Sequence, residues 1–283
     1  MKNDTNNNFY VLDVNYLRKP ELNNLLSSSK DNYFVVTENV IVETIKSNDW
    51  DFIYKKNFAI ICQYPEKIYV SSPIGNILEY ERQNKKTSKD IFNDQSTKYI
   101  RFILNEMKTG NLDSLDNILK KYISLAHQHV HSELLDYKKI KNSWLTIHND
   151  FMESSGSTLR EQLRKKQLSS DQLYDLTIQA IDEIYCNEQR FFDDSFSKEE
   201  IVNFKQENSM HYKLFASLVY NSFWWQIKKG LENMDAKKIT NEKFDIDNIL
   251  IALCGKEIYS QETYVNKLHD NVKNILKIRF NNT

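Results

Sequence analysis

In the first part of the chain, short runs of apolar residues alternate with segments whose apolar residues have helical spacing. Four runs are rich in β-branched and aromatic side chains, as expected of strands buried on both faces; they are residues 9–14, 33–36, 58–62 and 67–71. Between them, residues 20–26 place leucines at helical spacing behind Pro20, and residues 37–50 carry an apolar stripe behind Thr37, a residue type that caps helices. The pattern predicts β-α-β-α-β order and an α/β fold.

The middle of the chain has a different period. From about residue 99 to residue 239, apolar side chains recur three, four and seven positions apart, which predicts at least four amphipathic helices. Residues 152–158 are rich in Ser and Gly and predict a flexible connection within this block. We therefore expect a large all-helical insertion at residues 99–239.

The last part returns to an α/β pattern. Asp245 has the features of an N-cap, with an apolar stripe running from Ile246 towards a stop at Gly255. Residues 256–260 then predict a short strand that ends close to Glu262. We therefore expect one α/β domain made of two segments, residues 9–98 and 240–283, preceded by a disordered leader at residues 1–8.

Composition narrows the class of protein. The chain has 283 residues, 40% of them apolar, and only five Gly and three Pro, which favours helices over a sandwich with many tight turns. No apolar run approaches the ~20 residues that span a bilayer, and the polar start of the chain resembles no signal peptide, so we expect a cytoplasmic protein. The net charge of −1 gives no overall attraction to nucleic acid. Three scattered cysteines indicate neither a disulfide framework nor a zinc knuckle.

Four acidic residues stand beside or within apolar segments that are far apart in the chain. They are Asp13, Glu43, Asp245 and Glu262. Ligand sites in open parallel sheets lie at the carboxyl ends of the strands, so one fold can bring these carboxylates to a single edge. Carboxylate oxygens are hard ligands that suit Mg²⁺ or Mn²⁺, and those ions assist phosphate hydrolysis. A metal-dependent nuclease is therefore the leading hypothesis.

The same segments resemble the PIN-domain nucleases. In that family the first strand ends in Asp, with Asn or a similar residue two positions on, as in Asp13 and Asn15. A Glu on the helix after the second strand corresponds to Glu43, and a third acid that opens a helix corresponds to Asp245. The fourth acid follows the last strand in a Thr/Ser-x-Asp pattern, here written Ser260-Gln-Glu262.

The resemblance covers roughly residues 9–75 and 240–270 and departs from the family in two ways. Glu262 stands where Asp is usual, and Glu242 stands where an Asn-Asp pair is usual. Asp247 competes with Asp245 for the third position, because a small shift of the helix start would exchange their roles.

The resemblance implies a PIN-like three-layer fold and an endoribonuclease. Asp13, Asp245 and Glu262, assisted by Glu43 and with Asp247 as a further metal ligand, would hold one or two Mg²⁺ or Mn²⁺ ions, while Asn15 and Ser260 would orient water or phosphate. Bacterial members of the family act as toxins or phage-defence effectors on tRNA or mRNA, often under a protein inhibitor or activator. The substrate would then be RNA, with no membrane partner; a homo-oligomer is left open.

Two rival functions and two motifs stay open beside this hypothesis. A PIN-like module without catalysis would bind protein or RNA through its helical block, and a nucleotide phosphatase would need a closed pocket. The alternating histidines His127, His129 and His131 offer one pair at i,i+4 spacing, but a surface or packing role is favoured over zinc. The apolar run at residues 223–225 is favoured as core over a base-stacking surface.

Overall fold

The computed structural model describes most of the chain as two compact units. It describes residues 8–28, 31–112, 115–116, 119–120, 136–154, 156–165, 168–185, 195–228 and 231–281. The first unit comprises Met1–Ile74, Asp90–Asp136 and Asp247–His269, and the second comprises Gly75–Lys89, Tyr137–Ile246 and Asp270–Thr283. The first unit takes strands and helices from both ends of the chain. The predicted α/β class is therefore confirmed.

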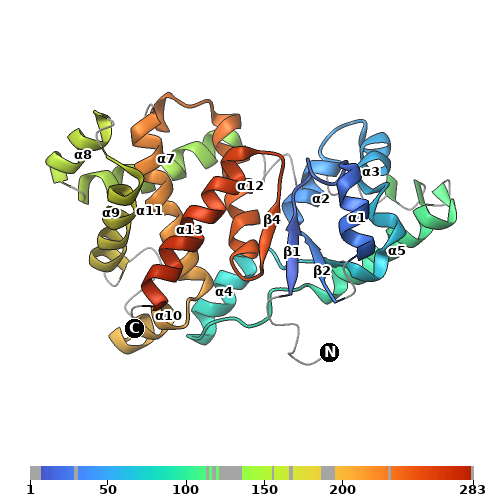
Figure 1. The fold of residues 1–283 in the computed structure, drawn as a ribbon, viewed down its shortest axis with the longest axis horizontal. Coiled ribbons are helices and arrows are strands. Elements are labelled where there is room, and N and C mark those ends of the chain that lie inside the picture. Colours follow the sequence, from blue (N-terminus) through green and yellow to red (C-terminus); the bar gives the residue numbers. More distant parts are fainter. Residues whose placement is uncertain are drawn as a thin grey trace. The chain divides into compact units, whose positions relative to one another are not determined.

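A parallel sheet forms the centre of the first unit (Figure 1). Its described strands are β1 (Phe9–Leu12), β2 (Tyr33–Val36), β3 (Ile68–Val70) and β4 (Glu257–Tyr259). Their order is β3-β2-β1-β4, and every neighbouring pair is parallel. The chain therefore builds from β1 outwards through β2 to β3, and returns much later to add β4 on the other side of β1.

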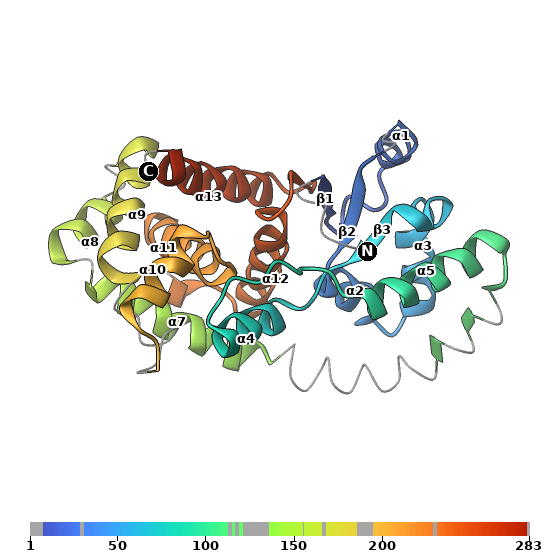
Figure 2. The same cartoon turned by 90° about the horizontal axis from the view of Figure 1, so that it is seen from below.

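Helices of the first unit cover one face of this sheet. They are α1 (Pro20–Ser28), α2 (Glu38–Ile45), α3 (Trp50–Phe58) and α5 (Asp94–Thr109). Leu26, Val40, Phe58 and Leu104, one from each helix, join a single buried cluster with strand residues such as Phe34. Crossovers of one hand that proceed in one direction along a sheet place their connecting helices on one face, which agrees with the shared cluster of α1, α2 and α3. Figure 2 shows α5 close to β3, and the Arg101 side chain of α5 donates to the Ile68 carbonyl at 2.9 Å.

The strand predictions hold for three of the four early runs. Residues 33–36 form β2, and the runs at 9–14 and 67–71 contain the shorter strands β1 and β3. The prediction for residues 58–62 is wrong, because this segment ends α3 and forms the 3-10 helix η1 (Ile61–Gln63). Phe58 and Ile61 are both buried at a helical spacing of three, and a run of five apolar residues cannot by itself separate a strand from a buried helix.

The helix predictions are corrected at two places. The helix expected at residues 37–50 is α2, which ends earlier, at Ile45, and α3 begins only at Trp50; Thr37 does cap α2, as expected, by accepting from the Val40 amide. The helix expected to begin at Asp245 begins nearly three turns earlier, since α12 spans Ala236–Ala252. Asp235 accepts from the Lys237 amide at 2.9 Å and takes the capping role that was predicted for Asp245.

The described residues of the second unit are helical or connect helices. Its helices include α4 (Ile74–Asn84), α7 (Tyr137–Ser154), α8 (Gly156–Arg164), α9 (Ser170–Ile184), α10 (Lys198–Gln206) and α11 (Met210–Lys228), together with the 3-10 helix η5 (Leu231–Asn233) and parts of α12 and α13 (Thr263–Asn281). Phe215, Val219 and Phe223 of α11 are fully buried, and Trp225 is nearly so. The expected core role of Phe223 and Trp225 is confirmed. The flexible connection expected at residues 152–158 is wrong for the described residues of that range, because residues 152–154 end α7 and residues 156–158 begin α8.

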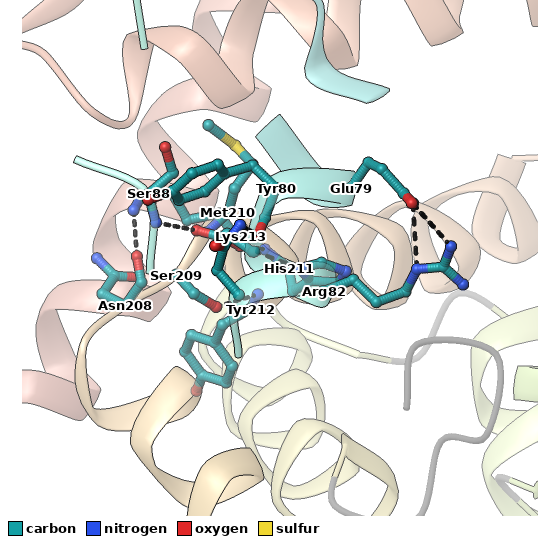
Figure 3. Close-up of polar contacts among 12 residues, drawn as sticks. Glu79, Tyr80, Arg82, Ser88, Asn208, Ser209, Met210, His211, Tyr212 and Lys213 are labelled. Atoms are coloured by element: carbon teal, nitrogen blue, oxygen red, sulfur yellow. Dashed lines mark hydrogen bonds and ion pairs between the residues drawn. The ribbon is translucent and has the colours of Figure 1, made fainter. Parts of the chain in front are cut away.

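A buried carboxylate, that of Glu81, ties α4 to the first turn of α11. Figure 3 shows residues around it, among them Ser88, Met210 and His211. The Glu81 side chain is 0% exposed and accepts from the backbone amides of Ser88 and Met210 at 3.0 Å and of His211 at 3.1 Å. The His211 ring nitrogen Nδ1 lies 3.0 Å from the same carboxylate. Burial alone would raise the pKa of Glu81, but these hydrogen bonds outweigh burial and hold the pKa below its usual value. Glu81 thus satisfies orphan amides at the start of α11.

None of the described helices combines the length and the apolar composition that crossing a membrane requires.

Candidate functional site

Each described strand of the sheet is followed by a buried polar residue. Ser71 follows β3, Thr37 follows β2, Asp13 follows β1 and Ser260 follows β4, with side chains that are 2%, 3%, 3% and 8% exposed. The strand register pairs Val36 with Val70, Val11 with Val35 and Leu12 with Tyr259, so the four polar positions fall in one row. This polar row marks the carboxyl edge of the sheet, where parallel sheets bind ligands.

The centre of the polar row lies between β1 and β4, on either side of which the chain adds strands in opposite directions. From β1 the chain adds strands on one side, and β4 is on the other, which makes the β1–β4 boundary the topological switch point. Here the Asp13 amide donates to the Tyr259 carbonyl at 3.0 Å, which continues the ladder by one residue. The Ser260 hydroxyl then donates to Asp13 Oδ2 at 2.6 Å, and the Val14 amide donates to Oδ1 at 2.7 Å.

Asn15 and Glu262 extend the contacts of this pair. The Asn15 Nδ2 group lies 3.3 Å from Ser260 Oγ and 3.4 Å from Glu262 Oε1. The Asn15 Oδ1 atom accepts from the Gln261 amide at 2.8 Å, and Ser260 Oγ accepts from the Glu262 amide at 3.0 Å. Four of the predicted site residues, from the two ends of the chain, therefore meet in one hydrogen-bonded cluster.

Glu43 approaches from α2. Its side chain is 21% exposed and forms an ion pair with Lys46 at 3.5 Å, one turn further along the helix. Burial is the main cause that raises the pKa of Glu43 above its usual value; Lys46 opposes this, and the charges of Asp13 and Glu262 raise the pKa further. Glu43 is thus close enough to both carboxylates to feel their charge.

The pKa of Asp13 is also raised above its usual value. Burial raises its pKa, the hydrogen bonds from Ser260, Val14 and Asn15 lower it, and the charge of Glu262 raises it, with a net rise. Asp13 and Glu43 therefore lie in a region in which burial and neighbouring negative charge, that of Glu262 included, oppose their ionisation. A bound cation would relieve this repulsion, as would protonation.

The third acid of the predicted set has two candidates on α12. Asp247 is a residue of the first unit, and the Asn39 side chain donates to its Oδ2 at 3.2 Å. Since Asn39 precedes Glu43 by four residues on α2, these two side chains share a helix face. Asp245 is a residue of the second unit, two positions away from Asp247 on a helix in which such positions do not face the same way. The contacts of the first unit thus favour Asp247.

Three polar residues near the site were missed from the sequence: Asn248, Asn39 and Lys46. The Thr37 hydroxyl hydrogen-bonds Asn248 Oδ1, and the Asn248 side chain is only 2% exposed. Lys46 donates to Glu43, and Asn39, one turn before Glu43 on α2, donates to Asp247. The available signal was the helical spacing of Asn39, Glu43 and Lys46, which places all three near one stripe of α2.

The described residues form no ready-made metal cage. No group of three or more His, Cys, Asp or Glu side chains within the described ranges is arranged to hold an ion. His127, His129 and His131 lie outside the described residues. The oxygen donors gathered beside Asp13 suit a hard divalent cation in chemical type, whereas a closed coordination shell would require the longer side chains to turn towards it.

Comparison of the chain with models of protein families, with curated proteins and with solved structures finds no match.

Proposed function

We propose that the first unit is a PIN-like, metal-dependent endoribonuclease with its active site at the carboxyl edge of the sheet. The observation that carries the proposal is the meeting of Asp13 and Ser260 at the switch point, joined by Asn15 and Glu262 and approached by Glu43. A buried carboxylate with a raised pKa, beside two more acids, is typical of functional sites. A buried acid with a purely structural role is more commonly paired with a Lys or Arg side chain.

Mg²⁺ or Mn²⁺ is the cofactor class that fits these donors. Asp13, Glu262 and Glu43 would supply carboxylate oxygens, with Asp247 or Asp245 as the further acid. Bound there, the ion would polarise a phosphodiester and lower the pKa of a water ligand. Ordinary flexibility of the two glutamate side chains is sufficient for them to turn, because Glu262 is exposed and Glu43 is only part-buried.

The chain's own residues have distinct roles in this proposal. Ser260 and the Val14 amide fix both oxygens of Asp13, so the carboxylate is pre-oriented at the end of β1. Asn15 holds Glu262 close to Ser260 and presents an amide that can orient water or phosphate. Lys46 neutralises Glu43 and is a candidate contact for a phosphate oxygen when the carboxylate turns away.

A cleavage assay tests the proposal. Labelled tRNA, mRNA and single-stranded DNA are incubated with the protein and Mn²⁺ or Mg²⁺, with EDTA as one arm. Wild type is expected to cut RNA, EDTA to stop cleavage, and Asp13→Asn to abolish it. Glu257→Gln is the matched control, because Glu257 is an exposed acid at the opposite, amino end of β4. Cleavage by Asp13→Asn at the wild-type rate would refute the assignment.

Two paired variants then decide the third acid. Asp247→Asn and Asp245→Asn are compared under the same conditions, and the contact between Asn39 and Asp247 leads us to expect the larger loss from Asp247→Asn. Action on tRNA or mRNA as a toxin or defence effector, under control of a protein partner, is part of the same proposal. Folded but inert protein that retains RNA would instead support a binding module.

A further inference from the structure

The side-chain amide of Asn248 carries a hydrogen-bond donor that the described part of the chain does not use. Asn248 stands on the portion of α12 that belongs to the first unit and is only 2% exposed. The Thr37 hydroxyl accepts from the Val40 amide and donates to Asn248 Oδ1, so the oxygen end of the side chain is fixed. The nitrogen Nδ2 carries two protons and donates to none of the described residues, although buried side-chain amides are nearly always paired. The NH₂ group is therefore available to an acceptor from outside the described chain.

The strand register places Asn248 beside Asp13. Val11 pairs with Val35, and Asp13 and Thr37 each stand two positions further on, so they are neighbours on one face of the sheet. Neighbouring strands are about 4.8 Å apart, and Asn248 is hydrogen-bonded to Thr37, so its amide is anchored one strand away from Asp13. Solvent reaches Nδ2, since the described atoms that are fully buried without a partner do not include it. A ligand that spans one strand spacing can therefore contact a metal ion at Asp13 and the NH₂ group at once.

The surroundings of this amide favour an anionic oxygen. An NH₂ group only donates, so it cannot ligate a cation. Thr37 caps α2, and the N-terminus of that helix carries the positive end of the helix dipole. On the other side of Thr37 in the polar row, the buried Ser71 hydroxyl also bonds none of the described residues and is a second donor. Two acids oppose an anion here: Glu38 is exposed and screened by solvent, and Asp247 is one of the carboxylates that a bound metal would neutralise.

We propose that Asn248 is a phosphate-binding residue, whose NH₂ group donates to a non-bridging oxygen of the phosphodiester at the metal site. The inference rests on the proposed function and adds a residue to its substrate contacts. A metal ion on the carboxylates would hold one oxygen of the phosphate, while Asn248 holds another. Because Thr37 fixes the amide before the substrate arrives, little side-chain freedom is lost on binding. The contact is made to the phosphate alone, so it adds affinity without preference for a base.

The test is binding of inorganic phosphate to the full chain, with Mg²⁺ in one arm and EDTA in the other, followed by ¹H–¹⁵N NMR. Inorganic phosphate has no phosphodiester to cut, so Mg²⁺ can be present throughout. The side-chain signals that are missing from Asn248→Asp identify Asn248, and in wild type they should shift as phosphate is added with Mg²⁺. Asn248→Asp keeps the acceptor for the Thr37 hydroxyl and replaces only the NH₂ group. It should weaken phosphate binding about 10- to 150-fold, the range expected for loss of a hydrogen bond to a charged group.

Two further variants keep the test decisive. Asn248→Leu removes the donor without adding a buried charge and should show the same loss, which covers the case in which Asn248→Asp does not fold. Asn57→Asp is the matched control, because Asn57 is a fully buried residue of the first unit whose side chain is already paired with Arg18 and Thr44. It should bind phosphate as wild type does.

The outcomes separate this inference from the proposed function. Asn248 signals that do not move with phosphate, or phosphate binding by folded Asn248→Leu at the wild-type affinity, would overturn the role of Asn248. Failure of the proposed function looks different: the Asn248 signals would still shift with phosphate, but Mg²⁺ would leave the affinity unchanged and RNA would stay uncut.

Discussion

Replacement of Glu81 by Gln should strongly destabilise the second unit. The wild-type carboxylate accepts from three backbone amides and contacts the His211 ring, all within a site where Glu81 is 0% exposed. Gln keeps the size of the side chain but offers one acceptor oxygen, and its NH₂ group faces donors. A single buried hydrogen bond to a charged group contributes about 1.5–3 kcal/mol, and breaking a buried pair typically costs about 3–5 kcal/mol. We expect a loss of about 3–5 kcal/mol.

Tryptophan fluorescence during urea denaturation measures this loss. Three of the four tryptophans, Trp144, Trp224 and Trp225, belong to the second unit, so the signal mainly reports that unit. With an m-value of about 1–3 kcal/mol/M, a loss of about 3–5 kcal/mol should lower the midpoint by roughly 1–5 M. Glu79→Gln, which changes an exposed acid of the same helix, should leave the midpoint near the wild-type value.

The dependence of this effect on pH follows from the pKa. Because the pKa of Glu81 is lowered in the folded protein, its stabilisation is fully present above the unfolded pKa of about 4.3 and is lost as pH falls through the folded pKa. The difference between wild type and Glu81→Gln should therefore be constant near neutral pH and shrink in acid. A variant midpoint equal to that of wild type at pH 7 would refute the reasoning.

Three further predictions concern the first unit. In EDTA, Asp13→Asn should be more stable than wild type. Because the pKa of Asp13 is raised in the folded protein, its ionisation costs wild type stability as pH rises from about 4 through the folded pKa. The difference in thermal unfolding midpoint between the variant and wild type should therefore widen as pH rises. Gly255→Ala should cost about 1–3 kcal/mol, measured by chemical denaturation, because the added Cβ would lie 2.5 Å from Cε2 of the buried Phe9 ring. Thr37→Val should cost about 1–3 kcal/mol, measured in the same way, by leaving Asn248 Oδ1 without the Thr37 hydroxyl and removing the cap of α2; Thr37→Ser should restore most of it.

Much of the sheet was predictable because its strands are short, strongly apolar and followed by a polar residue. Tyr33–Val36 is the clearest case, with Thr37 both ending the strand and capping the helix. Asp13, Asn15, Ser260 and Glu262 could be grouped from the sequence because parallel strands bring their carboxyl ends to one edge. Their meeting is local to the ends of two adjacent strands and needs no knowledge of the rest of the fold.

The features that were mispredicted depend on tertiary packing. Residues 58–62 are apolar enough for a strand but are buried on a helix end, and no local signal separates these two outcomes. At α12, Asp235 and Asp245 are both plausible caps, and the earlier one prevails because the residues between them extend the helix with a continuous buried side. The choice between Asp245 and Asp247 changed with that helix start.

Binding of Mn²⁺ to the full chain, followed by electron paramagnetic resonance, decides whether the carboxylates around Asp13 form a metal site. We expect wild type to bind Mn²⁺, Mg²⁺ to displace it, and Asp13→Asn and Glu262→Gln each to weaken binding at least tenfold, while Glu257→Gln does not. Equal Mn²⁺ binding by wild type, Asp13→Asn and Glu262→Gln, or no binding by folded wild type, would contradict a carboxylate metal site at the edge of this sheet.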